Sequence, residues 1–169
     1  GGNYNVLVGD EAGTAITTGD SNVFVGYQSG DATTTADSNV GIGRGTLTTN
    51  ILSDHNTAIG NGALFTHNQA SSTDSYNTAV GSNAGASVTT GYNNTLVGGL
   101  SGDALTTGHS NVAMGVSALG AATTSTYNTA IGISALEANT TGAANTALGG
   151  QALKANTTGA NNVAVGATA

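Results

Sequence analysis

The sequence predicts an all-β protein, a parallel β-solenoid of ten coils with a repeat period of 17. The first observation is a motif that recurs ten times from Asn5 to Asn162: Asn, then Val or Thr, a small or apolar residue, an aliphatic residue or Met, and Gly. Successive motifs begin at a spacing of 17, except that Asn77 follows Asn56 after 21. A fixed period of this length is typical of coils that stack on their neighbours. In addition, five Tyr, two Phe and no Trp, Pro or Cys leave too little bulky apolar volume for a globular core.

The Asn that opens each repeat, position one in the repeat numbering used below, is expected to form a ladder along the stack. Each side-chain amide would hydrogen-bond its copy in the next coil, and it can also bond the local backbone at the corner. The predicted ladder comprises Asn5, Asn22, Asn39, Asn56, Asn77, Asn94, Asn111, Asn128, Asn145 and Asn162.

Positions two to four have the β-branched and aliphatic composition of a short strand. Because side chains alternate along a strand, positions two and four lie on one face and position three on the other. We expect the residues at positions two and four to fill the coil interior. Position three is Leu, Phe, Gly or Ala and never polar, so we expect it to face a second copy of the chain. On this interpretation Ala130→Asp breaks the oligomer and leaves the coil intact.

Position five is always Gly, which predicts a positive φ, or a backbone too close for a Cβ, at each strand end. Opposite the strand, a small residue is followed by Gly or Leu and then by Thr-Thr-Gly, as in residues 12–19. We expect Thr-Thr to form a second short strand and the following Gly a turn. The Leu residues expected to fill the coil interior are Leu47, Leu64, Leu119, Leu136 and Leu153.

Residues 1–169 form one repeat region, in which coils spaced about 4.8 Å apart would make a rod on the order of 45 to 50 Å long. Because the chain begins and stops inside a repeat, we expect a segment of a longer protein. The fourth repeat carries a four-residue insertion within 65–76. Such an insertion forms an outward loop, which either binds a ligand or is tolerated without a role. The candidate surface-binding residues, suited to carbohydrate or protein contact, are Phe65, His67, Asn68, Gln69 and Tyr76.

The chain has only two basic residues and a net charge of −7. It therefore lacks the basic surface that nucleic acids and anionic membranes need, and no apolar run reaches the roughly 20 residues required for membrane insertion. Asp20, Asp37 and Asp54 share one repeat position, where a solvated corner is favoured over a cation site. His55 adjoins Asp54 and could form an acid–base pair with it, but the sequence supplies no nucleophile or pocket to accompany such a pair. The three His residues occupy different repeat positions, so they form no cluster of metal ligands. We predict no catalytic residue, no metal and no cofactor.

The stretch Asn-Thr-Ala-Ile-Gly at 128–132, followed by Ala-Leu at 135–136 and Thr-Thr-Gly at 140–142, resembles the repeats of phage tail-fibre and related bacterial surface-fibre proteins. Its core, Asn-x-Ala-Ile/Val-Gly, is similar to the head repeat of trimeric autotransporter adhesins. The resemblance covers essentially the whole chain. It implies a left-handed parallel β-roll wound as a homotrimer and located outside the cell, on a virion tail fibre or a bacterial cell surface. The repeat period is longer than that of the adhesin head, so the resemblance is compatible with both a phage tail fibre and a cellular adhesin.

The function expected from these observations is that of a structural shaft or head segment of an attachment fibre, without enzymatic activity. Its partners would be its own copies and a cell-surface glycan or protein receptor. The alternative is a monomeric solenoid that binds an ordered surface such as ice through its column of Thr hydroxyls. Adjacent Thr residues on a strand point to opposite faces, so only one column could face outward, and Ile51 and Leu52 interrupt it.

Overall fold

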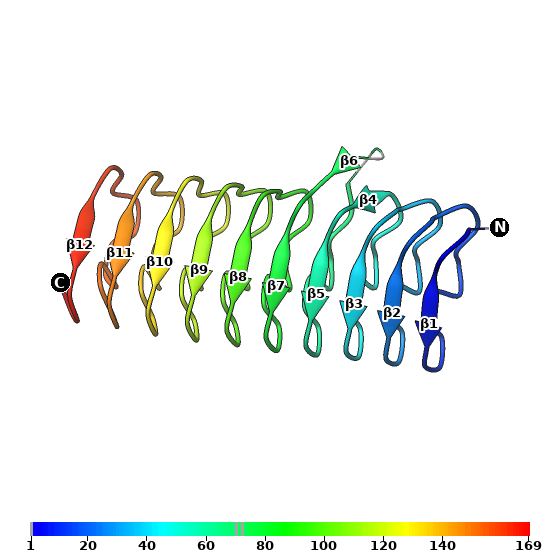
Figure 1. Ribbon diagram of the computed structural model, residues 1–169. Helices are drawn as coiled ribbons and strands as arrows, with labels where there is room; N and C mark the ends of the chain where they lie inside the picture. The colour runs from blue at the N-terminus through cyan, green and yellow to red at the C-terminus, as the bar shows by residue number, and fades with distance from the viewer. Residues whose placement is uncertain (1, 70, 72) are drawn as a thin grey trace.

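The computed structural model describes residues 2–69, 71 and 73–169. In this part of the chain, ten short strands pair side by side in one parallel sheet that follows the long axis of a rod (Figure 1). The predicted all-β parallel β-solenoid is confirmed, and the described residues form no helix. The strands of the sheet, in spatial order, are β1 (Val6–Val8), β2 (Val23–Val25), β3 (Val40–Ile42), β5 (Thr57–Ile59), β7 (Thr78–Val80), β8 (Thr95–Val97), β9 (Val112–Met114), β10 (Thr129–Ile131), β11 (Thr146–Leu148) and β12 (Val163–Val165).

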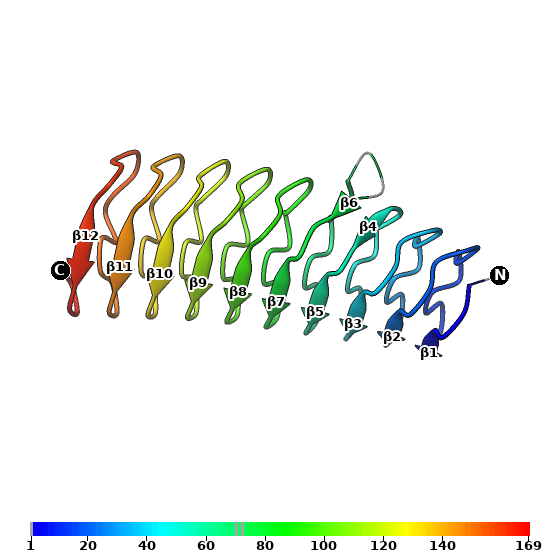
Figure 2. The same ribbon diagram turned by 45° about the horizontal axis from the view of Figure 1, so that its top comes forward.

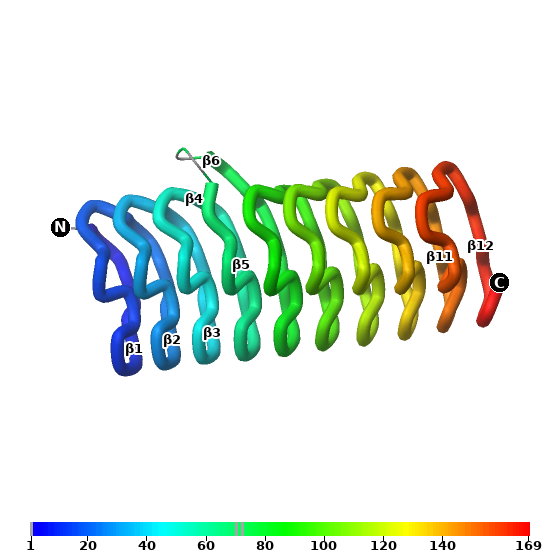
Figure 3. The backbone as a smooth tube through the Cα atoms, turned by 180° about the vertical axis from the view of Figure 1, so that it is seen from behind, coloured from blue at the N-terminus to red at the C-terminus, as the bar shows by residue number. Residues whose placement is uncertain are grey.

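Each strand pairs in register with the strand of the next repeat, as Val6 does with Val23. The chain passes around the coil between neighbouring strands, so the two ends of the chain lie at opposite ends of the rod (Figures 1 and 3). The insertion leaves this register unchanged, because Thr57 still pairs with Thr78. Two short strands, β4 (Ser53–Asp54) and β6 (Thr73–Asp74), pair in parallel at the insertion, where β6 stands out beside the rod (Figure 2). Residues 70 and 72 of the expected insertion lie outside the described residues.

The Asn residues at position one form a hydrogen-bonded ladder along the rod. The side-chain Oδ1 of Asn5 accepts from the backbone N–H and from the side-chain Nδ2 of Asn22, at 2.8 and 3.2 Å. The same Nδ2 also donates to the carbonyl of Ala36 at 2.8 Å, which ties the strand to the corner of the coil. The Asn-to-Asn pattern continues to the last repeat and also bridges the insertion. Because these buried amides bond only when the coils are aligned, the ladder holds the strands in register.

The Gly at position five ends each strand for both of the reasons predicted. Its φ lies between 124° and 139° in every repeat. At Gly132, an added Cβ would lie 2.5 Å from the carbonyl oxygen of Gly149 in the next coil. Any other residue would meet an unfavourable backbone conformation and would also push the neighbouring coils apart. This column of Gly therefore fixes where the chain turns back.

The two strand faces are the reverse of the prediction, because position three points into the coil and positions two and four point outward. Phe24 and Ala130, both at position three, are fully buried, whereas Ile131 at position four is 39% exposed. The physical reason is the narrow interior. Position nine, on the opposite side of the coil, also points inward, and the space between the two positions holds no more than one large side chain. Position three is therefore core and cannot be an interface between copies.

Positions three and nine fill most coils in a complementary way. In the coil of Ala58, whose position three is small, position nine is Leu64, and both residues are fully buried. Where position three is large, as at Phe24, position nine is Gly, and a Cβ on Gly30 would lie 2.5 Å from the Phe24 ring. A large side chain at one of these positions therefore accompanies a small residue at the other, because both positions share one interior space.

The coil of Ala79 differs, because its position nine is Gly85 and both residues are small. The space beside Gly85 is filled from the neighbouring coils, since a Cβ there would lie 2.7 Å from the side chain of Leu96 and 3.1 Å from that of Leu64. The prediction that Leu fills the interior is thereby confirmed: Leu47, Leu64, Leu119 and Leu136 are fully buried, and Leu153 packs against the core while partly buried.

This complementarity predicts that exchanging two interior residues is tolerated better than either change alone. Leu119→Gly leaves a cavity and is expected to cost about 2 to 4 kcal/mol of unfolding free energy. Ala113→Leu overfills the same coil and costs about 1 to 3 kcal/mol. The double variant copies the preceding repeat, which pairs Leu96 with Gly102, and should recover most of the loss. Chemical denaturation of the three variants measures the coupling, and losses that simply add would contradict it.

The Thr-Thr segments form bends and not the predicted second strands. Three consecutive backbone N–H groups, of Thr17, Thr18 and Gly19, converge on the carbonyl of Thr34 in the next coil at 2.9 to 3.2 Å. A strand would instead distribute its hydrogen bonds over successive carbonyls of its neighbour. The Thr17 hydroxyl also donates to the Thr34 carbonyl, at 3.1 Å. The bend thus joins adjacent coils at a single acceptor.

Candidate functional site

The outward face of the ten-stranded sheet is an uncharged surface that extends along the rod. Its side chains are Val or Thr at position two and Val, Ile, Leu or Met at position four, and none of the ten strands contains a charged residue. Ile42, Ile59, Met114 and Ile131 remain 36 to 39% exposed although strands flank them on both sides. The position-four column is apolar throughout, and the position-two column contains Thr as well as Val; an exposed apolar column of this length is typical of a face that another molecule covers.

The residues of the predicted binding loop do not come together in one site. Asn68 and Gln69 are half-buried and fasten the loop to the rod. The Asn68 Oδ1 accepts a backbone N–H of the preceding coil at 3.2 Å, and the Gln69 Nε2 donates to a backbone carbonyl of the next coil at 2.8 Å. Phe65 and Tyr76 are 44% and 53% exposed, but they belong to two different groups of side chains.

His67 lies inside the coil and not on the surface, which corrects the prediction. It occupies repeat position twelve, and the residue at that position in the next coil, Val88, is fully buried as well. Neither ring nitrogen of His67 has a partner in good hydrogen-bond geometry among the described residues, and the nearby backbone of Thr89 offsets only part of the effect of burial. Burial disfavours the charged imidazolium and lowers the pKa of His67 to about 4. His67 is therefore neutral near pH 7 and out of reach of a surface ligand.

The buried imidazole makes the stability of the coil depend on pH. The pKa of His67 is about 4 when folded and about 6.5 when unfolded, so the unfolded chain binds the proton first as the pH falls. The stabilisation is complete above pH 6.5 and declines by about 3 kcal/mol as the pH falls to 4. His67→Leu, which copies Leu105 at the same repeat position, is expected to remove this dependence. Thermal melts of both proteins from pH 7 to pH 4 test the prediction, and parallel profiles would contradict it.

Tyr76 joins a surface group formed around the carboxylate of Asp74. The Tyr76 hydroxyl donates to the Asp74 Oδ2 at 2.8 Å, and the His55 Nδ1 lies 2.9 Å from the Asp74 Oδ1. The hydrogen bond to Asp74 raises the pKa of the Tyr76 hydroxyl. The rings of His55 and Tyr76 are 5.1 Å apart. His55 thus pairs with a residue of the insertion and not with its sequence neighbour Asp54, and the pairing anchors the insertion to the rod.

The three aligned Asp residues form a hydrogen-bonded column in place of a solvated corner. The Asp37 Oδ1 accepts the backbone N–H of Asp20 at 2.6 Å, and the Asp54 Oδ1 accepts that of Asp37 at 2.7 Å. Each carboxylate therefore satisfies a backbone donor of the preceding coil. In the part of the chain that the structure describes, no group of three His, Cys, Asp or Glu side chains is placed to hold a metal ion.

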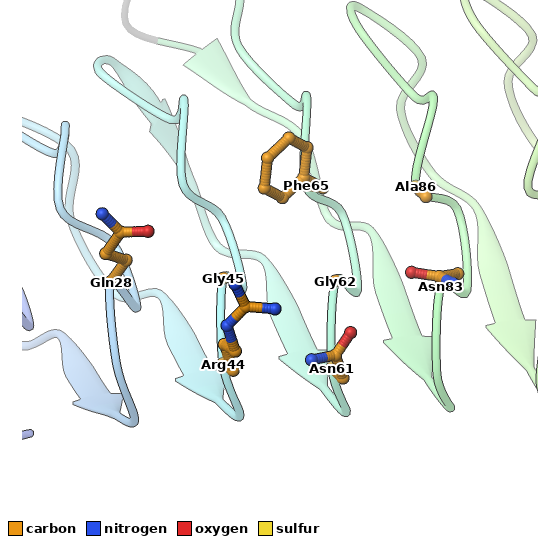
Figure 4. Close-up of a pocket in the computed structure, with 8 residues that line it drawn as sticks. All are labelled: Gln28, Arg44, Gly45, Asn61, Gly62, Phe65, Asn83 and Ala86. Atoms are coloured by element: carbon orange, nitrogen blue, oxygen red, sulfur yellow. The ribbon is translucent and has the colours of Figure 1, made fainter.

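A surface hollow of about 400 Å³ crosses four neighbouring coils, on the segments that run back from the Gly turns (Figure 4). It is opened by Gly45 and Gly62 at repeat position seven, where every other repeat carries a larger residue. The larger side chains that line it are Gln28, Arg44, Asn61, Phe65 and Asn83. Phe65 is the only residue of the predicted binding loop among them, and the hollow lies away from the strands of the sheet.

Two polar side chains of the hollow are directed toward a common space. Figure 4 shows the Arg44 guanidinium and the Asn61 amide pointing into the space between the two Gly residues, with the Phe65 ring above them. Arg44 lies 5.9 Å from the centroid of the Tyr27 ring, and no described carboxylate is within ion-pair distance of it. The sequence reasoning missed this hollow. The available signal was the pair of Gly residues at position seven in consecutive repeats, which removes two side chains from one face.

Both Thr residues of the bends reach the surface, in contrast to the prediction of a single outward column. The first Thr repeatedly donates its hydroxyl to a carbonyl of the next coil. The second Thr is exposed in each bend, and Leu52 and Gln69 interrupt its column. The uninterrupted part of that column consists of Thr90, Thr107, Thr124, Thr141 and Thr158.

Among the described residues, no helix has the length and apolar character of a bilayer span. No family model matches the chain, and no match was found among curated proteins or solved structures. The sheet face and the hollow are therefore interpreted from their own geometry and chemistry.

Proposed function

We propose that this chain is a structural segment, shaft or head, of a homotrimeric extracellular fibre that serves attachment, as part of a phage tail fibre or a bacterial surface adhesin. The observation that carries the proposal is the uncharged, exposed sheet face along the rod. Copies that pack through this face would bury the outward side chains at positions two and four of every strand. The resemblance of the repeats to those of trimeric fibre proteins supports an assembly of three chains.

The bonding between coils supports a mechanical role. The parallel sheet, the Asn ladder and the Thr bends all join a coil to the next one along the rod. In a solenoid, stability is approximately the sum of such nearest-neighbour contacts. Covering the exposed part of a position-four side chain adds on the order of 1 kcal/mol per coil, so a contact that runs along the whole rod accumulates over the repeats.

Static light scattering of the purified chain tests the proposal directly. The monomer mass is 16.2 kDa, and a homotrimer has three times that mass. We expect the trimer mass over a wide range of protein concentrations, together with resistance to proteases. A monomer mass at every concentration would contradict the fibre role.

The exposed run of second Thr residues favours one alternative, a monomeric solenoid that binds ice. Hydroxyls repeated at the spacing of the coils, about 4.8 Å, form a regular row along the rod. Thermal hysteresis of a monomeric solution, lost when Thr124→Tyr interrupts the row, would support this alternative. A trimer without thermal hysteresis would leave the fibre role as the better explanation.

A further inference from the structure

We propose that the hollow around Arg44 and Phe65 binds a carboxylate-bearing sugar, such as a uronic or sialic acid residue of an acidic glycan. The inference names a ligand class for the attachment role proposed above and rests on that role for its biological meaning. Asn61 lies beside Arg44, and Gln28 and Asn83 stand at the two ends of the hollow (Figure 4).

Phe65 provides an apolar platform for a sugar ring. It is the only aromatic residue at repeat position ten, where the other repeats have Thr, Asp, Ala, Gly, Glu or Lys. Phe65 is 44% exposed, and the missing side chain of Gly45 leaves one side of its ring uncovered, since a Cβ there would lie 3.5 Å from the ring. Small-ligand sites combine an apolar wall of this kind with a few polar groups that fix orientation. The C–H face of a pyranose ring matches such a wall, because it is apolar.

Arg44 gives the hollow a preference for a carboxylate. The second basic residue of the chain, Lys154, is paired with Glu137 at 3.1 Å. The Arg44 guanidinium is within ion-pair distance of no described carboxylate and points into the hollow (Figure 4). A guanidinium binds a carboxylate through two parallel hydrogen bonds. A neutral sugar could accept hydrogen bonds from this group only through uncharged oxygens, which form weaker contacts than a carboxylate, so an acidic sugar is the favoured ligand class.

The amides complete the site for a polyhydroxylated ligand. Asn61 and Asn83 each offer an oxygen acceptor and an N–H₂ donor, which suits sugar hydroxyls that both donate and accept. The Gln28 Nε2 donates to Glu11 of the preceding coil at 2.7 Å, so this amide nitrogen is already engaged. The volume of about 400 Å³ lies in the range of small-molecule sites. The hollow is open to the surface, so a sugar bound there could belong to a longer glycan.

Saturation-transfer NMR and titration with glucuronic acid and N-acetylneuraminic acid test the site, with glucose and sodium acetate as comparison probes. We expect at least one acidic sugar to bind more tightly than glucose and acetate. Arg44→Gln should weaken the binding of that acid about tenfold or more. Gly45→Gln should block the hollow, and the same repeat position accepts Gln28 and Asn83 with similar positive φ. Lys154→Gln, which removes the other basic residue far from the hollow, is the matched control and should bind like the wild type.

Three results would overturn the proposal: no acidic sugar binds, glucose binds equally well and is unaffected by Arg44→Gln, or acetate alone binds as tightly as the acidic sugars. Phe65→Ala distinguishes a sugar site from a site that binds only the carboxylate group. Loss of the aromatic platform should weaken the binding of an acidic sugar but not that of acetate. The mass of each variant is measured in parallel. A trimer that binds no sugar contradicts the site and not the fibre, whereas a monomer that binds an acidic sugar contradicts the fibre and not the site.

Discussion

Ala130→Asp is expected to unfold the coil around it and not merely to separate copies of the chain. Ala130 is fully buried at position three, between Ala113 and Ala147 of the paired strands. A single carboxylate without a partner in such an interior costs several kcal/mol. This loss is a large share of the roughly 5 to 15 kcal/mol that stabilises a typical domain. Circular dichroism and chemical denaturation should show a fall of several kcal/mol in unfolding free energy.

Ala130→Gly is the matched control, because Gly41 already occupies position three in another coil. It removes only a methyl group and is expected to cost about 1 kcal/mol. If Ala130→Asp instead melted like the wild type and changed only the oligomer mass, position three would face outward, as the sequence alone suggested. The two variants therefore decide the orientation of every strand in the sheet.

The repeat period predicted the fold because it is independent of which way a strand faces. It located the ten strands, the Gly turns with positive φ and the interior Leu residues such as Leu64. Alternation places positions two and four on a common face, but it does not say which face is interior. Polarity usually decides that question, and here neither face carries a charge. Polarity still offered a signal, because position two is Thr in five of the ten strands whereas position three is never polar.

The correct orientation was also present in the sequence as a correlation between distant positions. Phe24 occurs with Gly30, whereas Ala58 occurs with Leu64. Two positions that exchange volume in this way must share one interior space. Burial of His67 was harder to predict, because its repeat position twelve holds Val88 and Leu105 in later coils but Asn50 and Asn139 in others, and these Asn residues are buried as well. The hollow was also harder to predict, because it arises from missing side chains and not from a motif.

Ile131→Asp is expected to dissociate the proposed trimer and leave each coil folded. Ile131 is at position four of β10, outside the coil, and is 39% exposed in the single chain. In the monomer the new carboxylate remains in water, so the cost is the lower strand propensity of Asp, about 1 kcal/mol. In a trimer that packs through the sheet face, three carboxylates become buried around one axis. Each then costs several kcal/mol, which exceeds the contribution of any one coil to the contact.

The measurement combines light scattering with circular dichroism at the same protein concentration. The mass should fall from three chains toward the monomer value of 16.2 kDa, while the spectrum of the coil is retained. Thr141→Asp is the matched control, because it adds the same charge at an exposed bend in the same repeat and should leave the mass unchanged. A trimer that tolerates Ile131→Asp but is dissociated by Thr141→Asp would place the interface on the Thr bends. In that case the exposed Ile and Met side chains of the sheet face would take no part in the contact between copies, and this face would no longer support the proposed assembly.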